Sequence, residues 1–395
     1  MGARRFIIVA VSVSDPGTMG GNTKIAIEMA RHLPRHGWHV EVVVPRHKLP
    51  TFTKNIASVN GLNYHEIADF SGNALLHPLA SARHYTSELS VSFSKLGVGS
   101  EDVVFVTCSF YHEVVPVVRL KRQYGFTYLP SHFLFLPFIF ENLSRGYRFP
   151  ALKYLVLWFY ERFLFRKEKN AADGFVITND SDLRHFPEAM RTRVFAFYGG
   201  VNVEQIPQGD VPKTRDVVFC SRLHPQKGVE GLIDVWARVH AKCPAARLTI
   251  IGNGAPDYER QVRERADRLG IAGAIDWLGY VNNEEKYRIY RSARVHVHPT
   301  VYDNNGMVAA EALCSGLPVV MYDLPALRHV YTTGCVKVPY GDKDAFAGEI
   351  VRLLTDSAYL SSVAPAAADV SALRTKWNWA HRVELFHAFL EKLSE

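Results

Sequence analysis

The chain has 395 residues, of which 48% are hydrophobic and 22% are charged, enough for two or three domains with large cores. This composition excludes a disordered, collagen-like or low-complexity protein. The net charge of +7 belongs to the first half, because residues 1–200 hold 23 basic and 16 acidic groups while residues 201–395 hold 23 of each. We therefore expect two domains that face different partners.

The five cysteines are scattered and form no C-x-x-C pair, which is typical of reduced thiols rather than of a disulfide framework or a zinc site. The first residues lack the apolar core and cleavage site of a signal peptide. No stretch of about 20 residues is apolar enough for a membrane-spanning helix. The sequence thus predicts a cytoplasmic protein, either soluble or lying at the inner face of the plasma membrane.

Continuous apolar runs that alternate with helical patterns predict an α/β chain with two doubly wound parallel sheets. The glycines and prolines between residues 199 and 212 predict a domain boundary near residues 200–214. The expected strands cover residues 6–13, 40–44, 103–107, 175–178, 216–220, 248–251, 275–278, 295–298 and 318–321.

One segment is unusually aromatic and basic. Residues 124–165 hold 15 of the 47 aromatic side chains, and residues 144–170 hold seven basic and two acidic groups. Two interpretations stay open: a buried helix over an aromatic core, or a segment that lies on an anionic membrane.

Four loops that follow predicted strands carry residues suited to a diphosphate ligand. Residues 17–23 read G-T-M-G-G-N-T, which fits a phosphate at a helix N-terminus but equally a tight turn. Residues 221–228 read S-R-L-H-P-Q-K-G, where Arg222 and Lys227 can hold a diphosphate. Gly252 and Gly254 follow the strand at 248–251, and a plain turn explains them almost as well.

The fourth loop is the most specific. It places Asp303 and Glu311 on either side of Gly306, at the expected start of a helix after the strand at 295–298. The two carboxylates can grip hydroxyls at either end of a ligand, and free N–H groups between them can bind its phosphate.

These motifs resemble those of the retaining glycosyltransferases of family 4, also called group 1, which have the GT-B fold. The family's E-x7-E pattern appears as Asp303 and Glu311, followed by G-L-P-V-V at 316–320, and its G-R-L-x-x-x-K-G loop as the segment at 221–228. Further similar segments are Y-G-G-V-N at 198–202, Gly20 with Gly21, and L-G-Y-V at 278–281. The resemblance covers almost the whole chain and is looser across residues 50–170.

The resemblance implies two Rossmann-like domains facing a cleft: an acceptor-binding domain over 1–203 and a nucleotide-sugar-binding domain over 204–379. The C-terminal helix, at about 380–395, would return to the first domain.

The resemblance also implies roles for single residues. Glu311 would bind the ribose, Asp303 the donor sugar, and Arg222 with Lys227 the leaving diphosphate. His132 would be the histidine of the first domain that faces sugar and acceptor, with His112 as the second candidate. The remaining donor contacts would come from Gly20, Gly21, Gly252, Gly254, Tyr280, Val281, Asn305, Gly306, Met307 and Val308.

The chain departs from the family pattern at three of these positions. Asp303 is one methylene shorter than the usual Glu, Gly199 replaces Asn, and Asn202 replaces Asp. These departures leave the donor sugar open.

The sequence therefore predicts a retaining, metal-independent glycosyltransferase. It would move a sugar from a UDP- or GDP-sugar to a lipid-linked or glycan acceptor in envelope polysaccharide or glycolipid synthesis. It would need no cofactor and no nucleic acid, and residues 144–170 would contact an anionic membrane. A GT-B nucleotide-sugar epimerase and a non-catalytic sugar-nucleotide-binding or membrane protein remain alternatives. The missing G-x-G-x-x-G disfavours a dinucleotide oxidoreductase.

Overall fold

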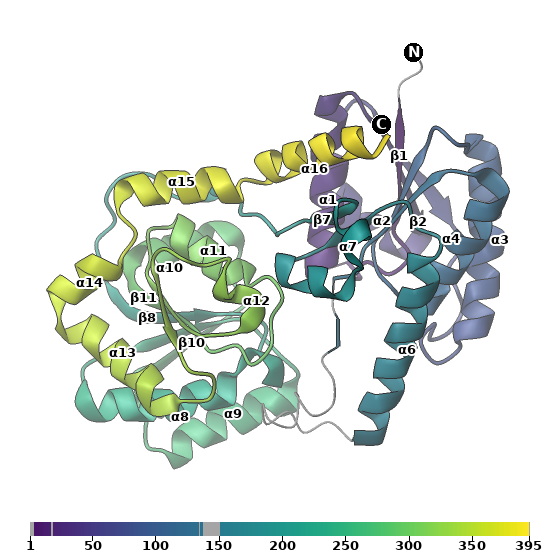
Figure 1. Cartoon of the computed structure of the whole chain (residues 1–395). Helices are drawn as coiled ribbons and strands as arrows, with labels where there is room; N and C mark the ends of the chain where they lie inside the picture. Colours follow the sequence, from purple (N-terminus) through teal and green to yellow (C-terminus); the bar gives the residue numbers. More distant parts are fainter. Residues whose placement is uncertain (1–3, 17–18, 134, 137–150, 395) are drawn as a thin grey trace. The chain divides into compact units, whose positions relative to one another are not determined.

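The computed structural model describes residues 4–16, 19–133, 135–136 and 151–394, with the backbone alone for 151–154 and 394. The chain divides into two compact units (Figure 1). Unit 1 comprises Met1–Gly199 and Ala380–Glu395, and unit 2 comprises Gly200–Trp379. The first crossing between the units lies four residues before the boundary expected after residue 203.

Unit 1 is built on a five-stranded parallel sheet with the order β3-β2-β1-β4-β5. A two-stranded parallel sheet, β6-β7, follows. The strands are β1 (Arg5–Val9), β2 (His39–Pro45), β3 (Leu62–Ile67), β4 (Val103–Val106), β5 (Thr127–Pro130), β6 (Phe175–Ile177) and β7 (Val194–Ala196).

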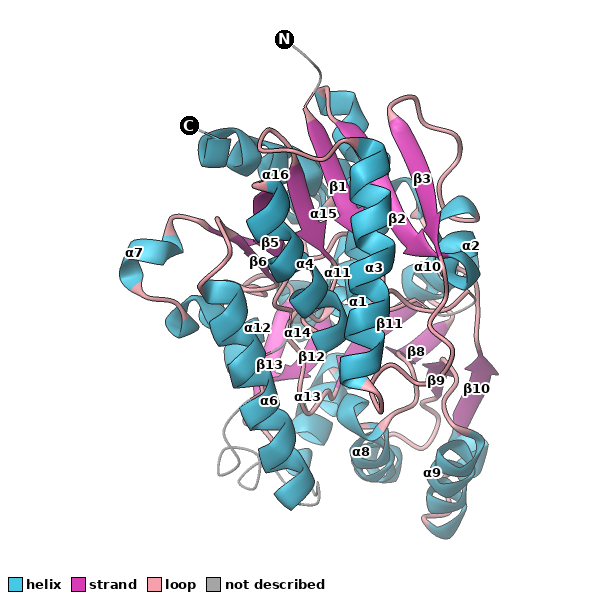
Figure 2. Cartoon of the chain, turned by 90° about the vertical axis from the view of Figure 1, so that its right-hand side faces the viewer, coloured by secondary structure: helices cyan, strands magenta, loops and turns pink. Residues whose placement is uncertain are grey.

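Helices cover both faces of this sheet. Successive side chains of β1 point to opposite faces, and each face packs against a helix. Ile7 and Val9 pack in a core with Leu89 of α3, whereas the ring of Phe6 meets that of Phe386 in α16. Figure 2 shows α3, α4 and α6 side by side on the first face. The helices of unit 1 are α1 (Gly21–His32), α2 (Leu49–Thr53), α3 (Pro78–Leu96), α4 (Tyr111–Tyr124), α6 (Ala151–Lys169), α7 (Glu188–Arg191) and α16 (Trp379–Ser394).

Unit 2 contains a six-stranded parallel sheet with the order β10-β9-β8-β11-β12-β13, the arrangement of a Rossmann fold. The strands are β8 (Arg215–Cys220), β9 (Leu248–Ile251), β10 (Ile275–Gly279), β11 (Ala293–His298), β12 (Val319–Tyr322) and β13 (Cys335–Val338). The helices are α8 (Val229–Lys242), α9 (Pro256–Arg268), α10 (Asn283–Ser292), α11 (Met307–Cys314), α12 (Pro325–Arg328), α13 (Lys343–Thr355), α14 (Ser357–Val363) and α15 (Ala367–Trp377).

The two chain segments that join the units are bonded to each other. Val201 N–H donates to Trp377 O over 2.7 Å, and Val201 forms an isolated parallel bridge with Asn378. A Cβ added at Gly200 would lie 2.4 Å from Cδ2 of Trp379, so glycine is required there for this close approach.

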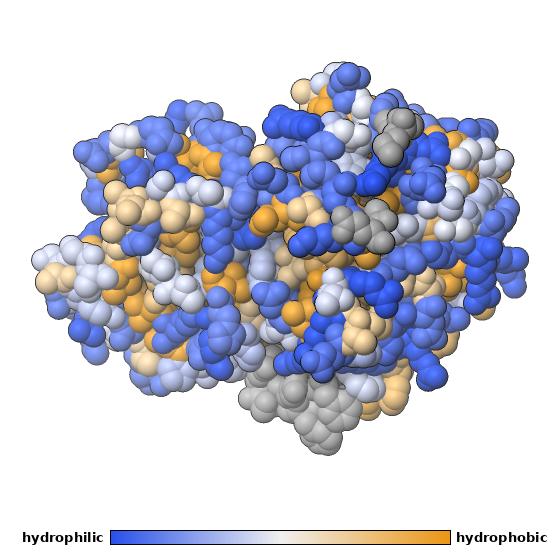
Figure 3. All heavy atoms as spheres, turned by 45° about the horizontal axis from the view of Figure 1, so that its top comes forward, coloured by the Kyte–Doolittle hydropathy of each residue, from blue (hydrophilic) through white to orange (hydrophobic). Residues whose placement is uncertain are grey.

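The face of the molecule drawn in Figure 3 is mainly hydrophilic, with small apolar areas between polar ones. Among the helices that the structure describes, none combines the length and the hydropathy needed to cross a bilayer.

Candidate active site

Both sheets reverse their strand order next to their first strand, between β1 and β4 in unit 1 and between β8 and β11 in unit 2. Open α/β sheets bind ligands at the carboxyl ends of the strands at such a point. The loop at 221–228 follows β8, and the loop with Asp303 follows β11. The two motifs, 75 residues apart in the sequence, are therefore neighbours at the carboxyl edge of the unit 2 sheet.

Asp303 and Lys227 form a close ion pair between these two loops. Lys227 Nζ donates to Asp303 Oδ2 over 2.7 Å, and both side chains are largely buried. Burial opposes ionisation of Asp303, but Lys227 and His298 lower its pKa far below the usual range, and N–H donors reinforce this. The other oxygen, Oδ1, accepts from the backbone N–H groups of Asn305 and Gly306 at 3.1 and 3.0 Å.

Through these two backbone bonds, the short Asp303 side chain stabilises the loop that leads into α11. Gly306 has φ 61°, a left-handed conformation, and starts α11 as its N-cap. Its N–H is committed to Asp303, so the amides of Met307 and Val308 in the first turn of α11 are the ones left for an anion. Tyr331 donates its hydroxyl to the carbonyl of Gly306 over 2.8 Å, which fixes the start of the helix.

Glu311, on the first turns of α11, has a cationic partner that the sequence motifs did not reveal. Lys286 of α10 donates to Glu311 Oε1 over 2.7 Å. Burial opposes the charge on Lys286, yet the neighbouring Glu311 raises the pKa of the ammonium group overall. The second oxygen of Glu311, Oε2, is shielded from solvent and has no hydrogen-bond partner among the described residues.

Backbone hydrogen bonds join the other donor-side loops that the sequence predicted. Leu223 N–H donates to Asn253 O over 2.9 Å, next to Gly252 and Gly254. Gly252 N–H donates to Gly279 O over 2.7 Å, next to Tyr280. The Tyr280 ring is 79% exposed and Arg222 is also exposed, whereas Val281 is partly buried. These loops therefore present a cation and an aromatic ring at one edge of unit 2.

In unit 1, the glycine loop and His112 adjoin each other. Gly20 N–H donates to Ser14 Oγ over 2.9 Å, and Gly21 begins α1. His112, at the start of α4, places Nε2 3.1 Å from Ser12 Oγ. Burial lowers the pKa of His112 to about 4, and the charge of Lys48 adds to this shift, so its imidazole is neutral at neutral pH. Part of the glycine loop, residues 17–18, lies outside the described residues.

His132 occupies a closed position deeper in unit 1. Its Nε2 lies 2.9 Å from Glu161 Oε1 and its Nδ1 3.2 Å from Glu168 Oε2, both on α6. Although burial disfavours the charged ring, the two carboxylates raise the pKa of His132 to about 9. The ring is 1% exposed. A substrate can reach it only if this arrangement opens, so its catalytic role stays a prediction.

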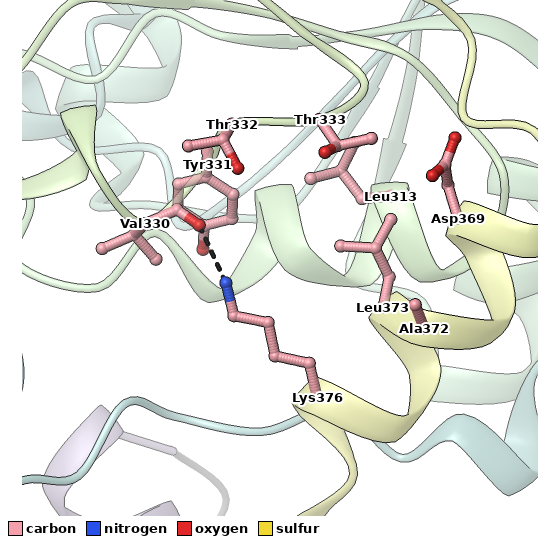
Figure 4. A pocket seen from close by; sticks show the side chains of 9 residues that line it. All are labelled: Leu313, Val330, Tyr331, Thr332, Thr333, Asp369, Ala372, Leu373 and Lys376. Atoms are coloured by element: carbon pink, nitrogen blue, oxygen red, sulfur yellow. Dashed lines mark hydrogen bonds between the residues drawn. The ribbon is translucent and has the colours of Figure 1, made fainter.

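A separate hollow in unit 2 is lined by none of the predicted site residues, although Tyr331, which contacts Gly306, is part of its wall. It is a cavity of about 200 Å³ between α11, α15 and the segment after α12 (Figure 4). Lys376 crosses it and donates to Val330 O over 3.2 Å. Its lining consists of Leu313, Val330, Tyr331, Thr332, Thr333, Asp369, Ala372, Leu373 and Lys376.

The architecture is that of the GT-B fold, and solved structures match it over nearly the whole chain. Sucrose-phosphate synthase from Thermosynechococcus elongatus superimposes with a TM-score of 0.77 at 17% identity, covering 99% of both chains. Anabaena HepE, solved in complex with UDP-glucose, gives a TM-score of 0.72 at 15% identity, again covering 99% of both. The predicted fold class is thus confirmed.

A family model and a curated relative each match part of the chain. Residues 214–356 match the family described as Glycosyl transferases group 1, so unit 2 carries a group 1 glycosyltransferase domain and the resemblance read from the motifs is confirmed. A phosphatidyl-myo-inositol mannosyltransferase of Mycobacterium leprae is 32% identical over 216 residues, which is 52% of this chain and 56% of that protein. The chain thus aligns with little more than half the length of this relative.

Proposed function

We propose that the protein is a retaining, metal-independent glycosyltransferase. It transfers a sugar from a UDP- or GDP-sugar to a hydroxyl of a lipid-linked or glycan acceptor in glycolipid or envelope polysaccharide synthesis. The observation that carries the proposal is the arrangement around α11, where Asp303 and Glu311 lie before and after an open helix N-terminus and each pairs with a partly buried lysine. The relative just described is named as a mannosyltransferase, which makes mannose the first sugar to test.

Different groups along the carboxyl edge of the unit 2 sheet bind the base, the ribose, the diphosphate and the sugar of the donor. Tyr280 offers a ring on which a base can stack, and Glu311 accepts from a ribose hydroxyl. The diphosphate lies against the first-turn amides of Met307 and Val308, between Lys227 and Arg222. Asp303 accepts from hydroxyls of the sugar.

The reaction breaks the bond between the anomeric carbon and the diphosphate oxygen. Negative charge develops on the diphosphate, and preorganised cations and amides stabilise that charge more strongly than they stabilise the ground state. The acceptor hydroxyl attacks from the side that the diphosphate leaves, and its proton passes to the departing oxygen. Lys227, Arg222 and the α11 amides supply the positive charge that a metal ion supplies in other transferases.

In unit 1, the neutral His112 contacts Ser12, close to the loop with Gly20 and Gly21 that we expect to contact the donor. A neutral imidazole can accept a hydrogen bond from a hydroxyl and orient it. We therefore place His112 before His132 as the acceptor-side histidine. Substituting His112 by Ala should raise the KM for the acceptor, whereas the response of His132→Ala should be dominated by lost stability.

Release of nucleoside diphosphate from a panel of UDP- and GDP-sugars, with lipid and glycan acceptors and with EDTA present, tests the proposal. Lys227→Met should lower kcat about 100- to 1000-fold, because it removes one stabilising cation from the leaving group. Lys343→Met is the matched control, since Lys343 forms a similar ion pair with Asp234 in unit 2 over 2.6 Å, away from these loops. Its kcat should equal that of the wild type.

Absence of diphosphate release with every donor and acceptor would contradict the transferase. Conversion of the sugar nucleotide without any acceptor would instead identify an epimerase. Loss of activity in EDTA that added metal restores would contradict metal independence, and inversion of the anomeric configuration in the product would contradict retention.

A further inference from the structure

Unit 1 exposes an apolar stripe along α6. Val156, Phe159 and Phe163 follow one another at helical spacing and are 51 to 62% exposed. Arg166 and Lys167 continue the same stripe one turn further and are also exposed. The Lys167 ammonium lies 5.0 Å from the centre of the Phe163 ring, which ties the cationic and aromatic parts together.

The acidic residues of α6 lie on the opposite side of the helix, which faces the interior of unit 1. Glu161 and Glu168, the two acidic residues of the helix, both point to His132. Leu164 and Phe165, on the same side, are buried. The outward face of α6 is therefore apolar and cationic, without a carboxylate.

A second exposed apolar group lies where α3 begins. Leu75, Leu76 and Leu79 are 59 to 74% exposed, and Arg83 is exposed one turn after Leu79. The chain has no acidic residue between Phe70 and Ser87. This group, the leucine turn, repeats the order seen on α6: apolar side chains first, then a cation.

Both groups project past the same edge of the unit 1 sheet. His84 Nε2 lies 2.9 Å from the carbonyl oxygen of Ala68, directly after β3, so position 84 of α3 lies level with the carboxyl edge. His132, two residues after β5, holds Glu161 at that edge in the same way. Leu79 and Val156 each lie five residues before these anchors, which is about 7.5 Å further out at 1.5 Å per residue. Figures 1 and 2 show α6 extending beyond the sheet.

We propose that the α6 stripe and the leucine turn together form a docking surface for an anionic lipid bilayer. Their apolar side chains would enter the acyl region, while Arg83, Arg166 and Lys167 would meet the headgroups. Charge favours this partner over a second copy of the chain, because two such surfaces would bring like cations together. The surface lies at the edge of unit 1 that also carries His112 and the glycine loop. A bilayer there would present a lipid acceptor to those residues.

Flotation of the full-length protein with vesicles of phosphatidylcholine, with and without phosphatidylglycerol, tests the surface. The wild type should float with anionic vesicles at low salt and much less at high salt. Phe159→Ser/Phe163→Ser and Leu75→Ser/Leu76→Ser should each weaken the apparent binding about ten-fold or more. Arg166→Glu/Lys167→Glu should remove the preference for phosphatidylglycerol.

The control is Val91→Ser/Lys95→Glu, which changes one exposed apolar residue and one exposed cation near the other end of α3. It should bind as the wild type does, and thermal unfolding should show that all variants are folded. Brominated lipid should quench Phe159→Trp more than Val91→Trp.

Three outcomes overturn the proposal: no flotation of the wild type at either salt, equal binding by the surface variants and the control, or a dimer that Phe159→Ser/Phe163→Ser dissolves. Vesicle binding needs no donor and no turnover. A result that overturns the docking surface therefore does not contradict the proposed transferase activity. A result that overturns the transferase activity likewise does not contradict the docking surface.

Discussion

Lys286 positions the carboxylate expected to bind the ribose. It donates to one oxygen of Glu311 and leaves the other for a ribose hydroxyl. We predict that Lys286→Met raises the KM for the donor about ten-fold with a smaller effect on kcat, because Glu311 loses the partner that orients it. It should also narrow the difference in affinity between a nucleoside diphosphate and its 2′-deoxy analogue, measured by calorimetry. Lys286→Arg should restore part of the donor KM and part of the discrimination against the 2′-deoxy analogue. An unchanged KM in Lys286→Met would contradict the role of Lys286 in orienting Glu311.

His132 makes the stability of unit 1 depend on pH. Its pKa rises from 6.5 to about 9 on folding, so its contribution is complete below about pH 6.5 and is lost as the pH rises through about 9. The loss is about 3 kcal/mol over that range. Burial raises the pKa of Glu168, and this shift lowers stability with rising pH in the same sense.

Urea unfolding at several pH values measures this dependence. In His132→Gln the slope between about pH 6.5 and 9 should become shallower, with the contribution of Glu168 left, and unfolding should cost about 3–5 kcal/mol less near pH 6.5, because two buried carboxylates lose their cation. Equal slopes in both proteins would show that His132 is not charged in the folded state.

The residue patterns predicted motif positions but not the side chains that pair with them in the fold. Asp303 and Glu311 could be read from spacing around Gly306. Lys286 could not, because it precedes Glu311 by 25 residues and reaches it only through the packing of α10 beside α11. The ion pairs of His132 could not be predicted from the sequence either, because Glu161 and Glu168 follow it by 29 and 36 residues on another element.

Among the elements, the loop that holds Lys227 depends on glycine at position 228. Gly228 has φ 71°, and a Cβ there would lie 2.0 Å from the carbonyl oxygen of Pro299. We predict that Gly228→Ala destabilises the protein by about 2 kcal/mol. It should also raise the KM for the donor, because the loops after β8 and β11 must separate.

Gly231→Ala, three residues further in α8, is the control for this substitution. Its Cβ would have only Lys343 Cε near it, at 3.8 Å. Alanine should therefore stabilise the helix by about 0.5–1 kcal/mol. Chemical denaturation of both variants measures the difference, and a Gly228→Ala protein as stable as Gly231→Ala would refute the packing argument.

At this scale, most strands found from the sequence were buried ones, although β10 was found with only its first residue buried and the buried β5 was missed. All nine predicted runs contain strands, including β1, β8 and β11 in the sheet centres. The sequence missed β3, β5, β7 and β13. Half-exposed polar positions interrupt β3, an edge strand that reads L-N-Y-H-E-I, and β13 includes Lys337. Polar residues in these two edge strands interrupt the apolar pattern on which the sequence prediction depends.

For the whole molecule, α16 is a component of unit 1 although it ends the chain. The ring of Phe386 is buried against Phe6 and Phe195, and Trp38 Nε1 donates to His387 Nδ1 over 3.1 Å. We predict that Phe386→Ala lowers the stability of unit 1 by about 3–5 kcal/mol. Hydrogen exchange should then rise in peptides of unit 1, including β1, and stay unchanged in β8 and β11.

Leu385→Ala is the neighbouring control. Leu385 is 41% exposed, and its truncation should change stability by less than about 0.5 kcal/mol. Equal increases in exchange across both units after Phe386→Ala would show that the units unfold as one.

The paired crossing segments make unit 2 an insertion whose two ends meet. Val201 and Trp377 are hydrogen-bonded, so the chain leaves and re-enters unit 1 through neighbouring points. A unit attached in this way can be exchanged as a whole. A nucleotide-binding unit from another protein could replace it if its two ends lie next to each other. The path of the chain through unit 1, from β7 onward to α16, would stay as it is.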